Sequence, residues 1–314
     1  MDHRKADPTW MCGSLGISVH WTSGTVLLNG KSLPYREAVD RFDPVRFAKR
    51  LAAVGAGHCI FTLTHAEQYL PLPHPVLERL LPGRTASRDL IGELIEALEA
   101  ENIRLIAYYN HSCNGEDDPV WKSACGYAAG VKGNLDRFAE NICDIVAFIA
   151  ARYGRGLAGW WFDSSYSVDP RGPHNTISCE MGEWRFPWEA LAEAARSGHR
   201  ECAVTFNAGI GSRFLYASCQ DYYAGESVRL DEPFSPEAVP GIRDHRWICI
   251  DSPGWMLSAE NCAGGFADPR FTQAELKTFV RKQRAAGNMV TFNLQIDQGG
   301  ILNPKALAAL KCLE

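Results

Sequence analysis

The sequence lacks long hydrophobic runs and an excess of basic residues. No stretch approaches the about 18 consecutive apolar residues that a membrane-spanning helix needs, so a membrane protein is not expected. The formal net charge is −5, which argues against nucleic acid as a partner, because phosphate binding requires a basic surface. No apolar run follows the charged N-terminus, which predicts that there is no signal peptide.

Paired cysteines are also missing. The 11 cysteines are scattered from Cys12 to Cys312 and form neither a CxxC pair nor a zinc-finger spacing. Cys59, Cys143 and Cys249 lie within apolar segments, where a free cysteine behaves as a small hydrophobic residue. The pattern favours a reducing, cytoplasmic location with no resident metal or cofactor, although it leaves room for a structural disulfide.

Apolar segments with strand character alternate with helical patterns along the whole chain, without repeats, low-complexity tracts or a convincing linker. Strands are expected at 16–21, 58–65, 104–110, 159–163, 202–207, 220–226 (the weakest), 246–251 and 288–296, with helices at 44–54, from Ser87, and at 134–153, 189–196, 272–286 and 304–310. Parallel strands need crossover helices, so this alternation predicts an α/β fold, a single (β/α)₈ TIM barrel over residues 1–314. An open doubly wound sheet is the alternative, but no glycine-rich fingerprint follows the first strand.

Polar residues gather where the predicted strands end. They are His20, His65, Asn110 with His111, Asp163, Asn207, Glu226, Asp251, and Asn293 with Gln295 and Asp297. In a parallel barrel these ends meet at the C-terminal mouth, where barrel enzymes have their active sites. We therefore expect these side chains to surround one pocket.

Two of these residues are carboxylic acids that follow aromatic residues. Asp163 ends the aromatic strand 159–163, and Glu226 comes shortly after Tyr222 and Tyr223. A buried carboxylate is costly unless something pairs with it or uses it. Aromatic walls suit the C–H faces of sugar rings, and two carboxyl groups with separated pKa values can hydrolyse a glycoside.

Several segments carry a more specific resemblance. They are Leu15-Gly16-Ile17-Ser18-Val19-His20-Trp21, Phe42-Asp43-Pro44 with Phe47-Ala48, Thr64-His65, Tyr108-Tyr109-Asn110, Trp161-Phe162-Asp163, Asp221-Tyr222-Tyr223-Ala224-Gly225-Glu226, the run 287–294, and Gly299-Gly300-Ile301. Together they resemble motifs of the α-L-fucosidases of glycoside hydrolase family 29, over most of residues 15–310.

The resemblance implies a retaining exo-glycosidase that acts on a terminal α-L-fucoside or a related sugar. It implies Asp163 as the nucleophile and Glu226 as the general acid/base. The residues expected to bind the carbohydrate substrate are His20, Trp21, His65, Tyr109, Asn110, Trp161, Asn207 and Asn293.

The chain also departs from the family pattern. The family's paired histidines are Thr64-His65 here, its Glu-Trp pair has no clear counterpart (Tyr35-Arg36-Glu37 is nearest), and an arginine common after the fifth strand falls near Gly209, with Arg213 as a replacement. No room is left for the β-sandwich that usually follows the barrel. These departures affect the identity of the sugar more than the chemistry of the two carboxyl groups.

Three questions stay open at this level. His20, His65, His111, Asp163 and Asp251 could instead hold a divalent ion in a metal-dependent barrel hydrolase or isomerase. The barrel could also bind sugars without catalysis. If Glu226 is not the acid/base, Asp251 and Glu260 are the next candidates, and a homo-oligomer is compatible with the many aromatic residues.

Overall fold

The computed structural model describes residues 6–114, 117–127, 135–232, 239–251, 254–262, 264–311 and 313. Eight parallel strands form one curled sheet in the order β5-β4-β3-β2-β1-β8-β7-β6. They are β1 (Leu15–Val19), β2 (Ala56–Thr62), β3 (Arg104–Asn110), β4 (Leu157–Asp163), β5 (Ala203–Phe206), β6 (Glu226–Ser227), β7 (His245–Cys249) and β8 (Met289–Asn293). The predicted (β/α)₈ TIM-barrel class is confirmed.

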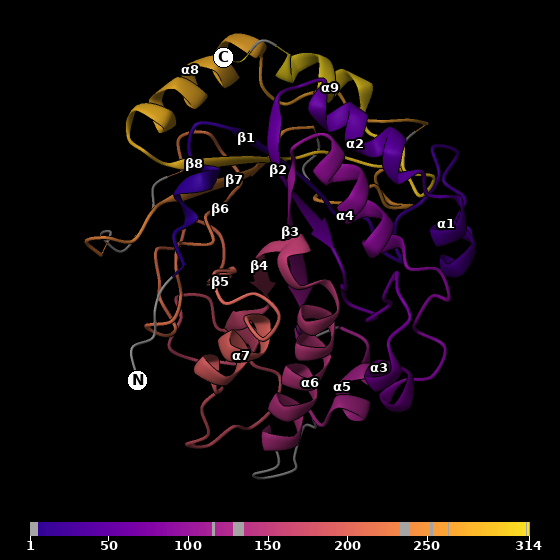
Figure 1. Ribbon diagram of the computed structural model, residues 1–314, viewed down its shortest axis with the longest axis vertical. Helices are drawn as coiled ribbons and strands as arrows, with labels where there is room; N and C mark the ends of the chain where they lie inside the picture. Colours follow the sequence, from indigo (N-terminus) through magenta and orange to yellow (C-terminus); the bar gives the residue numbers. More distant parts are fainter. Residues whose placement is uncertain are drawn as a thin grey trace.

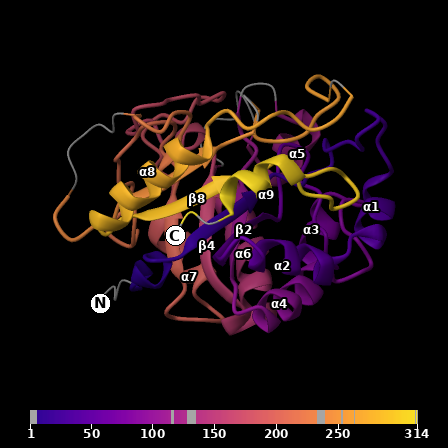
Figure 2. The same ribbon diagram turned by 90° about the horizontal axis from the view of Figure 1, so that it is seen from above.

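Helices cover the outside of the strands (Figure 1). They are α1 (Tyr35–Arg41), α2 (Pro44–Ala52), α3 (Pro75–Leu80), α4 (Leu90–Ala100), α5 (Pro119–Cys125), α6 (Leu135–Tyr153), α7 (Trp188–Ala195), α8 (Gln273–Ala285) and α9 (Pro304–Leu310). Short 3₁₀ turns lie at Pro8–Met11, Gly154–Gly156 and Ser165–Ser167. Figure 2 shows α8 and α9 beside β8, next to the N-terminal β1. None of the described helices is long and apolar enough to cross a membrane.

Side chains alternate between the barrel interior and the layer under the helices, as the two-residue period of a strand requires. One apolar cluster fills the interior and includes Ile106, Tyr108, Trp161 and Trp247. A second, larger cluster lies between strands and helices and includes the neighbouring residue Tyr109. Whether a residue occupies an odd or an even position along its strand (its parity) therefore decides whether its side chain points into the barrel and can reach the mouth.

A polar layer occupies the bottom of the interior. Thr291 Oγ1 lies 2.8 Å from Nε2 of His58 and 2.8 Å from Nε2 of His245. A Cβ at position 16 would lie 1.9 Å from His58 Nε2, so only Gly16 leaves room for this imidazole. Burial lowers the pKa of His58 to about 3 and that of His245 to about 4. Both rings are therefore neutral structural groups.

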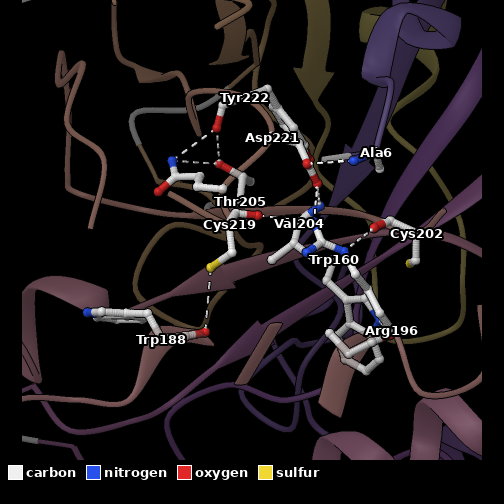
Figure 3. A network of polar contacts seen from close by, with 12 residues as sticks. Ala6, Trp160, Trp188, Arg196, Cys202, Val204, Thr205, Cys219, Asp221 and Tyr222 are labelled. Atoms are coloured by element: carbon white, nitrogen blue, oxygen red, sulfur yellow. Dashed lines mark hydrogen bonds and ion pairs between the residues drawn. The ribbon is translucent and has the colours of Figure 1, made fainter. Parts of the chain in front are cut away.

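The segment before β6 closes the barrel against β5 (Figure 3). The backbone N–H of Asp221 donates to Val204 O over 2.9 Å, and Asp221 Oδ2 accepts from Val204 N over 2.7 Å. The same carboxylate accepts from Ala6 N and from Arg196 Nη2, at 2.8 and 2.6 Å. Asp221 thus joins the N-terminal segment, α7 and β5 at the place where the strand ladder is interrupted.

The predicted elements are found near their expected positions, with corrections at the ends. The predicted helix from Ser87 begins at Leu90 instead, because the Asp89 carboxylate accepts the Gly92 N–H and caps it. The sixth strand is confined to Glu226–Ser227, with a single bridge before it. The ten cysteines within the described part of the chain are free thiols.

Candidate active site

A cavity of about 410 Å³ opens at the C-terminal ends of the strands. It is lined by His20, His65, Asn110, Asn114, Asp117, Asp163, Tyr166, Glu226, Trp247, Gly254, Trp255, Met256, Ser258, Glu260 and Asn261. A larger hollow of about 540 Å³ lies beside the opposite, N-terminal ends of β3 and β4, where Arg104 and Leu105 line it. The chemistry-bearing side chains gather in the first cavity, as expected for a barrel enzyme.

Asp163, at the end of β4, is surrounded by donors. Its Oδ2 accepts from the Tyr108 hydroxyl over 2.5 Å and from Asn110 Nδ2 over 3.2 Å. Its Oδ1 accepts from Ser164 N over 2.7 Å and from Asn207 Nδ2 over 2.9 Å. These four donors, together with the Tyr166 hydroxyl at 3.5 Å from Oδ1, fix the position of the carboxyl group.

Glu226, at the start of β6, is tied to the same amide. Asn207 Nδ2 donates to Glu226 Oε2 over 2.7 Å, in addition to its bond to Asp163. The two acceptor oxygens therefore cannot be further apart than the sum of 2.7 and 2.9 Å. Carboxyl pairs at about 5–5.5 Å allow direct attack on an anomeric carbon, whereas about 6.5–9.5 Å leaves room for a water molecule.

The electrostatic setting of Glu226 differs from that of its partner. Burial raises its pKa to about 8, the charge of Asp163 adds to the increase, and the hydrogen bond from Asn207 opposes it. Glu226 is therefore protonated at neutral pH. Glu226 is thus held as an acid beside Asp163, which is surrounded by hydrogen-bond donors. Acid–base chemistry on two carboxyl groups requires such a difference between their environments.

A chain of hydrogen bonds fixes the tautomer of His20. Asn293 Nδ2 donates to Trp255 O over 2.7 Å, which leaves Asn293 Oδ1 as an acceptor for Ser18 Oγ at 3.1 Å and His20 Nδ1 at 2.9 Å. His20 Nδ1 must therefore carry the proton, and Nε2 is left with a lone pair. Burial and the neighbouring His65 lower the pKa of His20 to about 4, so the ring is neutral.

Aromatic rings form one wall of the cavity. Trp247 is stacked on His20 with a centroid separation of 5.5 Å, and Trp255 lies 4.9 Å from Trp247. His65 is stacked parallel to Tyr108 at 6.2 Å. The cavity thus combines aromatic surface with polar atoms, a combination that fits a sugar ring with one apolar face.

Five of the eight predicted substrate-binding residues lie at or directly against the two carboxyl groups or the cavity. His20, His65 and Asn110 line it, Asn207 bridges the carboxyl groups, and Asn293 holds His20. Their contact with a sugar stays a prediction.

The other three face elsewhere. Trp21 is 1% exposed and packs against Tyr35 and Phe42 in the outer core. Tyr109 also faces the outer layer, and Trp161 lies in the interior, where its Nε1 donates to Ala224 O over 3.0 Å. These placements correct the expected roles, because strand parity turns Tyr109 away from the mouth and Trp21, beyond the end of β1, packs into the outer core.

Asp251 and His111, which the sequence offered for an alternative site, do not line the cavity. Asp251 is fully buried and accepts from Gln295 N over 2.7 Å and Asn303 Nδ2 over 3.1 Å, outside the cavity. Burial raises the pKa of Asp251 to about 6. His111 is stacked on Phe162 in the outer layer. Within the described part of the chain, no three His, Cys, Asp or Glu side chains converge in a way that could hold a metal ion.

Several cavity residues were not predicted. Tyr108 and Tyr166 both reach Asp163, Asp117 and Asn114 line the wall after β3, and Trp255 comes from the loop after β7. Tyr108 could have been found from parity, since it pairs with Trp161 in the register that sets Asn110 opposite Asp163. The loop residues carry no comparable signal, because loop conformation has no fixed period.

Together these features define a (β/α)₈ barrel with a paired-carboxyl cavity at its C-terminal mouth. No family model matches the chain, and no curated protein matches its sequence. An endo-fucoidan hydrolase of glycoside hydrolase family 107 has a similar structure, with a TM-score of 0.69 and 16% identity over 96% of this chain and 90% of that chain.

Two further structures show the same likeness. Another endo-fucoidan hydrolase of family 107 has a TM-score of 0.70 and 17% identity, over 96% of this chain and 62% of that chain. A family 29 α-L-fucosidase from Bacteroides thetaiotaomicron, trapped as a covalent intermediate, has a TM-score of 0.65 and 17% identity, over 99% of this chain and 75% of that chain. At these identities the likeness establishes the shared fold.

Proposed function

We propose that this chain is a retaining exo-glycosidase that removes a terminal α-L-fucose or a related sugar. The observation that carries the proposal is the single Asn207 nitrogen that donates to both Asp163 and Glu226. It limits the distance between Asp163 Oδ1 and Glu226 Oε2 to at most the sum of 2.9 and 2.7 Å, which is compatible with the about 5–5.5 Å that direct displacement requires. The fold, shared with enzymes named as fucosidases and endo-fucoidan hydrolases, supports the same conclusion.

In the first step Asp163 attacks the anomeric carbon while Glu226 protonates the departing oxygen. Glu226 Oε2 accepts from Asn207, so Oε1 carries the proton that is transferred. The donors around Asp163 hold its attacking oxygens in place. In the second step the ionised Glu226 takes a proton from water, which attacks the glycosyl–Asp163 ester and releases the sugar with its configuration retained.

The sugar would lie between the aromatic wall and the polar wall. Nε2 of His20 has a lone pair and accepts a sugar hydroxyl, while the partly exposed ring of Trp255 contacts C–H groups.

The loop after β7 forms one wall of the cavity. A cavity bounded on this side favours removal of a terminal sugar. That loop is attached to the loop after β1, through Thr22 Oγ1 to Met256 Sδ at 3.0 Å and Val26 N to Leu257 O at 3.1 Å.

Turnover of aryl glycosides tests the proposal. The panel contains α-L-fucoside, α- and β-D-galactoside, α-L-rhamnoside and β-L-arabinoside, and the proteins are wild type, Asp163→Ala and a control, Glu201→Gln, far from the cavity. We expect hydrolysis by wild type and the control, and its loss in Asp163→Ala. Proton NMR should detect the retained anomer first. Equal activity in Asp163→Ala, an inverted first product, or no hydrolysis of any substrate would refute the proposal.

A further inference from the structure

The cavity contains acidic side chains in excess. Asp117, Asp163, Glu226 and Glu260 line it, and its described lining includes no lysine or arginine. Asp163 and Glu226 have the two proposed chemical roles, which leaves Asp117 and Glu260 without one. Lys122, which does not line the cavity, acts electrostatically on Asp117, and the negative charge that remains acts on whatever enters.

These two additional carboxylates face each other across the barrel mouth. Asp117 follows β3 and Glu260 follows β7, and these strands are four positions apart in the order of the eight-stranded sheet. Asp117 is half-buried, with one oxygen accepting from Asn114 N over 3.0 Å, whereas Glu260 is exposed at the rim. A ligand that enters the cavity therefore passes between two acidic walls before it reaches Asp163.

Two cationic side chains that follow β3 and β5, Lys122 and Arg213, do not line the cavity, and each is held by another group. The Lys122 ammonium donates to Asn114 O, and Arg213 Nε donates to Asp244 Oδ1 over 2.8 Å. Arg213 was the predicted replacement for the family's arginine, and it does not line the cavity. Burial lowers the pKa values of His20 and His65, so these rings do not supply positive charge at neutral pH.

We propose that this cavity selects uncharged glycosides and excludes those that carry sulfate, phosphate or carboxylate groups. The inference rests on the proposed function and narrows its substrate class. Like charges repel more strongly in a cavity than in bulk water, because the effective dielectric constant is lower. A site that discriminates in this way uses repulsion against the wrong ligand rather than extra contacts with the right one.

A matched pair of substrates isolates charge from size. The para-(carbamoylmethyl)phenyl and para-(carboxymethyl)phenyl α-L-fucosides are nearly isosteric, and the methylene group keeps their leaving groups similar. The cationic para-(aminoethyl)phenyl fucoside completes the series. If another glycone is the better substrate, the same three aglycones are placed on it. The measured quantity is kcat/KM for each substrate at low and high ionic strength.

We expect wild type to favour the neutral substrate over the anionic one by about tenfold at low salt, and by less at high salt. The cationic substrate should be at least as good as the neutral one. Glu260→Gln and Asp117→Asn should each reduce the preference. Glu201→Gln removes the same charge from the opposite end of the barrel, so it should leave the preference unchanged.

The two proposals fail in different ways. Turnover of the neutral and anionic substrates at equal rates, independent of salt, would overturn the charge selection while leaving the glycosidase intact. A preference that Glu260→Gln and Asp117→Asn do not alter would also overturn it. Absence of turnover with every member of the series, on every glycone, would overturn both proposals.

Discussion

Asp163 Oδ1 and Glu226 Oε2 accept hydrogen bonds from the same nitrogen, Asn207 Nδ2, over 2.9 and 2.7 Å. An amide nitrogen has two hydrogens, so each carboxyl group receives one of them. Their spacing is therefore set by a third residue, at the end of β5, that would not itself react. This relationship makes the roles of the three side chains separable by experiment.

Substitution of Asn207 by Ala should lower kcat/KM by about 10–100-fold, because the carboxyl groups lose their common support. Circular dichroism and the urea midpoint would verify that the variant is folded. The loss should be smaller than in Asp163→Ala, since the nucleophile remains. Unchanged kcat/KM in a folded Asn207→Ala variant would show that the bridge has no part in catalysis.

Glu226→Gln should separate substrates by their leaving groups. A protonated carboxyl is required only when the departing oxygen is a strong base, so aryl glycosides with acidic phenols should keep a measurable first step while alkyl glycosides lose it. Because the pKa of Glu226 is raised to about 8, kcat/KM of wild type for poor leaving groups should fall as pH rises through about 8. If Glu226→Gln lowered kcat/KM by the same factor for all substrates, the acid role would belong to another residue.

The same raised pKa has a consequence for stability. Between the ordinary value of 4.5 and about 8, the folded state holds a proton on Glu226 that the unfolded state has lost. Stability must therefore decrease as pH rises through this window. Gln mimics the protonated form, so Glu226→Gln should exceed wild type in stability by about 3–5 kcal/mol at about pH 9, because each pH unit of this window contributes about 1.4 kcal/mol, with little difference below about pH 4.5.

Denaturant melts of both proteins across this pH range measure the effect. A matched control is Glu201→Gln, whose carboxylate is exposed at the opposite end of the barrel, and its difference from wild type should not vary with pH in this way. A constant difference between Glu226→Gln and wild type at all pH values would contradict the shifted pKa.

The fold could be predicted from the sequence because buried parallel strands and amphipathic helices leave clear periodic patterns. The two central carboxyl groups could also be found, since polar residues at strand ends in a barrel share one mouth. The sequence pattern points to Tyr109, whereas its neighbour Tyr108 faces Asp163, and the strand register distinguishes the two. Trp21 lies two residues beyond the end of β1 and packs into the outer core, which the strand pattern alone does not reveal.

The loop side chains could not be predicted. Asp117 and Trp255 reach the cavity through loops whose course depends on many tertiary contacts, such as the hydrogen bond from Asn293 to Trp255 O. Asp251 shows the converse problem. It ends a strand as Asp163 does, but Gln295 N and Asn303 bind its carboxylate away from the cavity.

Asn293→Asp should change the protonation of His20. A carboxylate in place of the amide would favour the imidazolium form, so the pKa of His20 should rise from about 4 towards its ordinary value. The Nε2 lone pair is then lost as the pH falls, and kcat/KM should decline at a higher pH than in wild type. NMR titration of the His20 ring measures the shift. Superimposable titration curves for the two proteins would contradict the contact between the side chain at position 293 and the His20 ring.

Asp221→Ala should destabilise the barrel where it closes. The Asp221 side chain is fully buried, at 0% exposure, and binds Arg196 together with the N–H groups of Ala6 and Val204. Removing one partner of such a buried pair typically costs about 3–5 kcal/mol. The exposed pair of Lys305 with Asp268, at 55% and 82% exposure, should contribute less than about 1 kcal/mol.

Urea unfolding of Asp221→Ala and Lys305→Ala compares the two pairs directly. Asp221 begins the segment that leads to Glu226, so loosening the closure should also lower kcat for poor leaving groups more than for good ones. Asp221→Asn keeps the shape and part of the hydrogen bonding, and should recover some stability. If Asp221→Ala unfolds at the same urea concentration as Lys305→Ala, the closure is held by the apolar interior around Tyr222 and Trp161 rather than by this carboxylate.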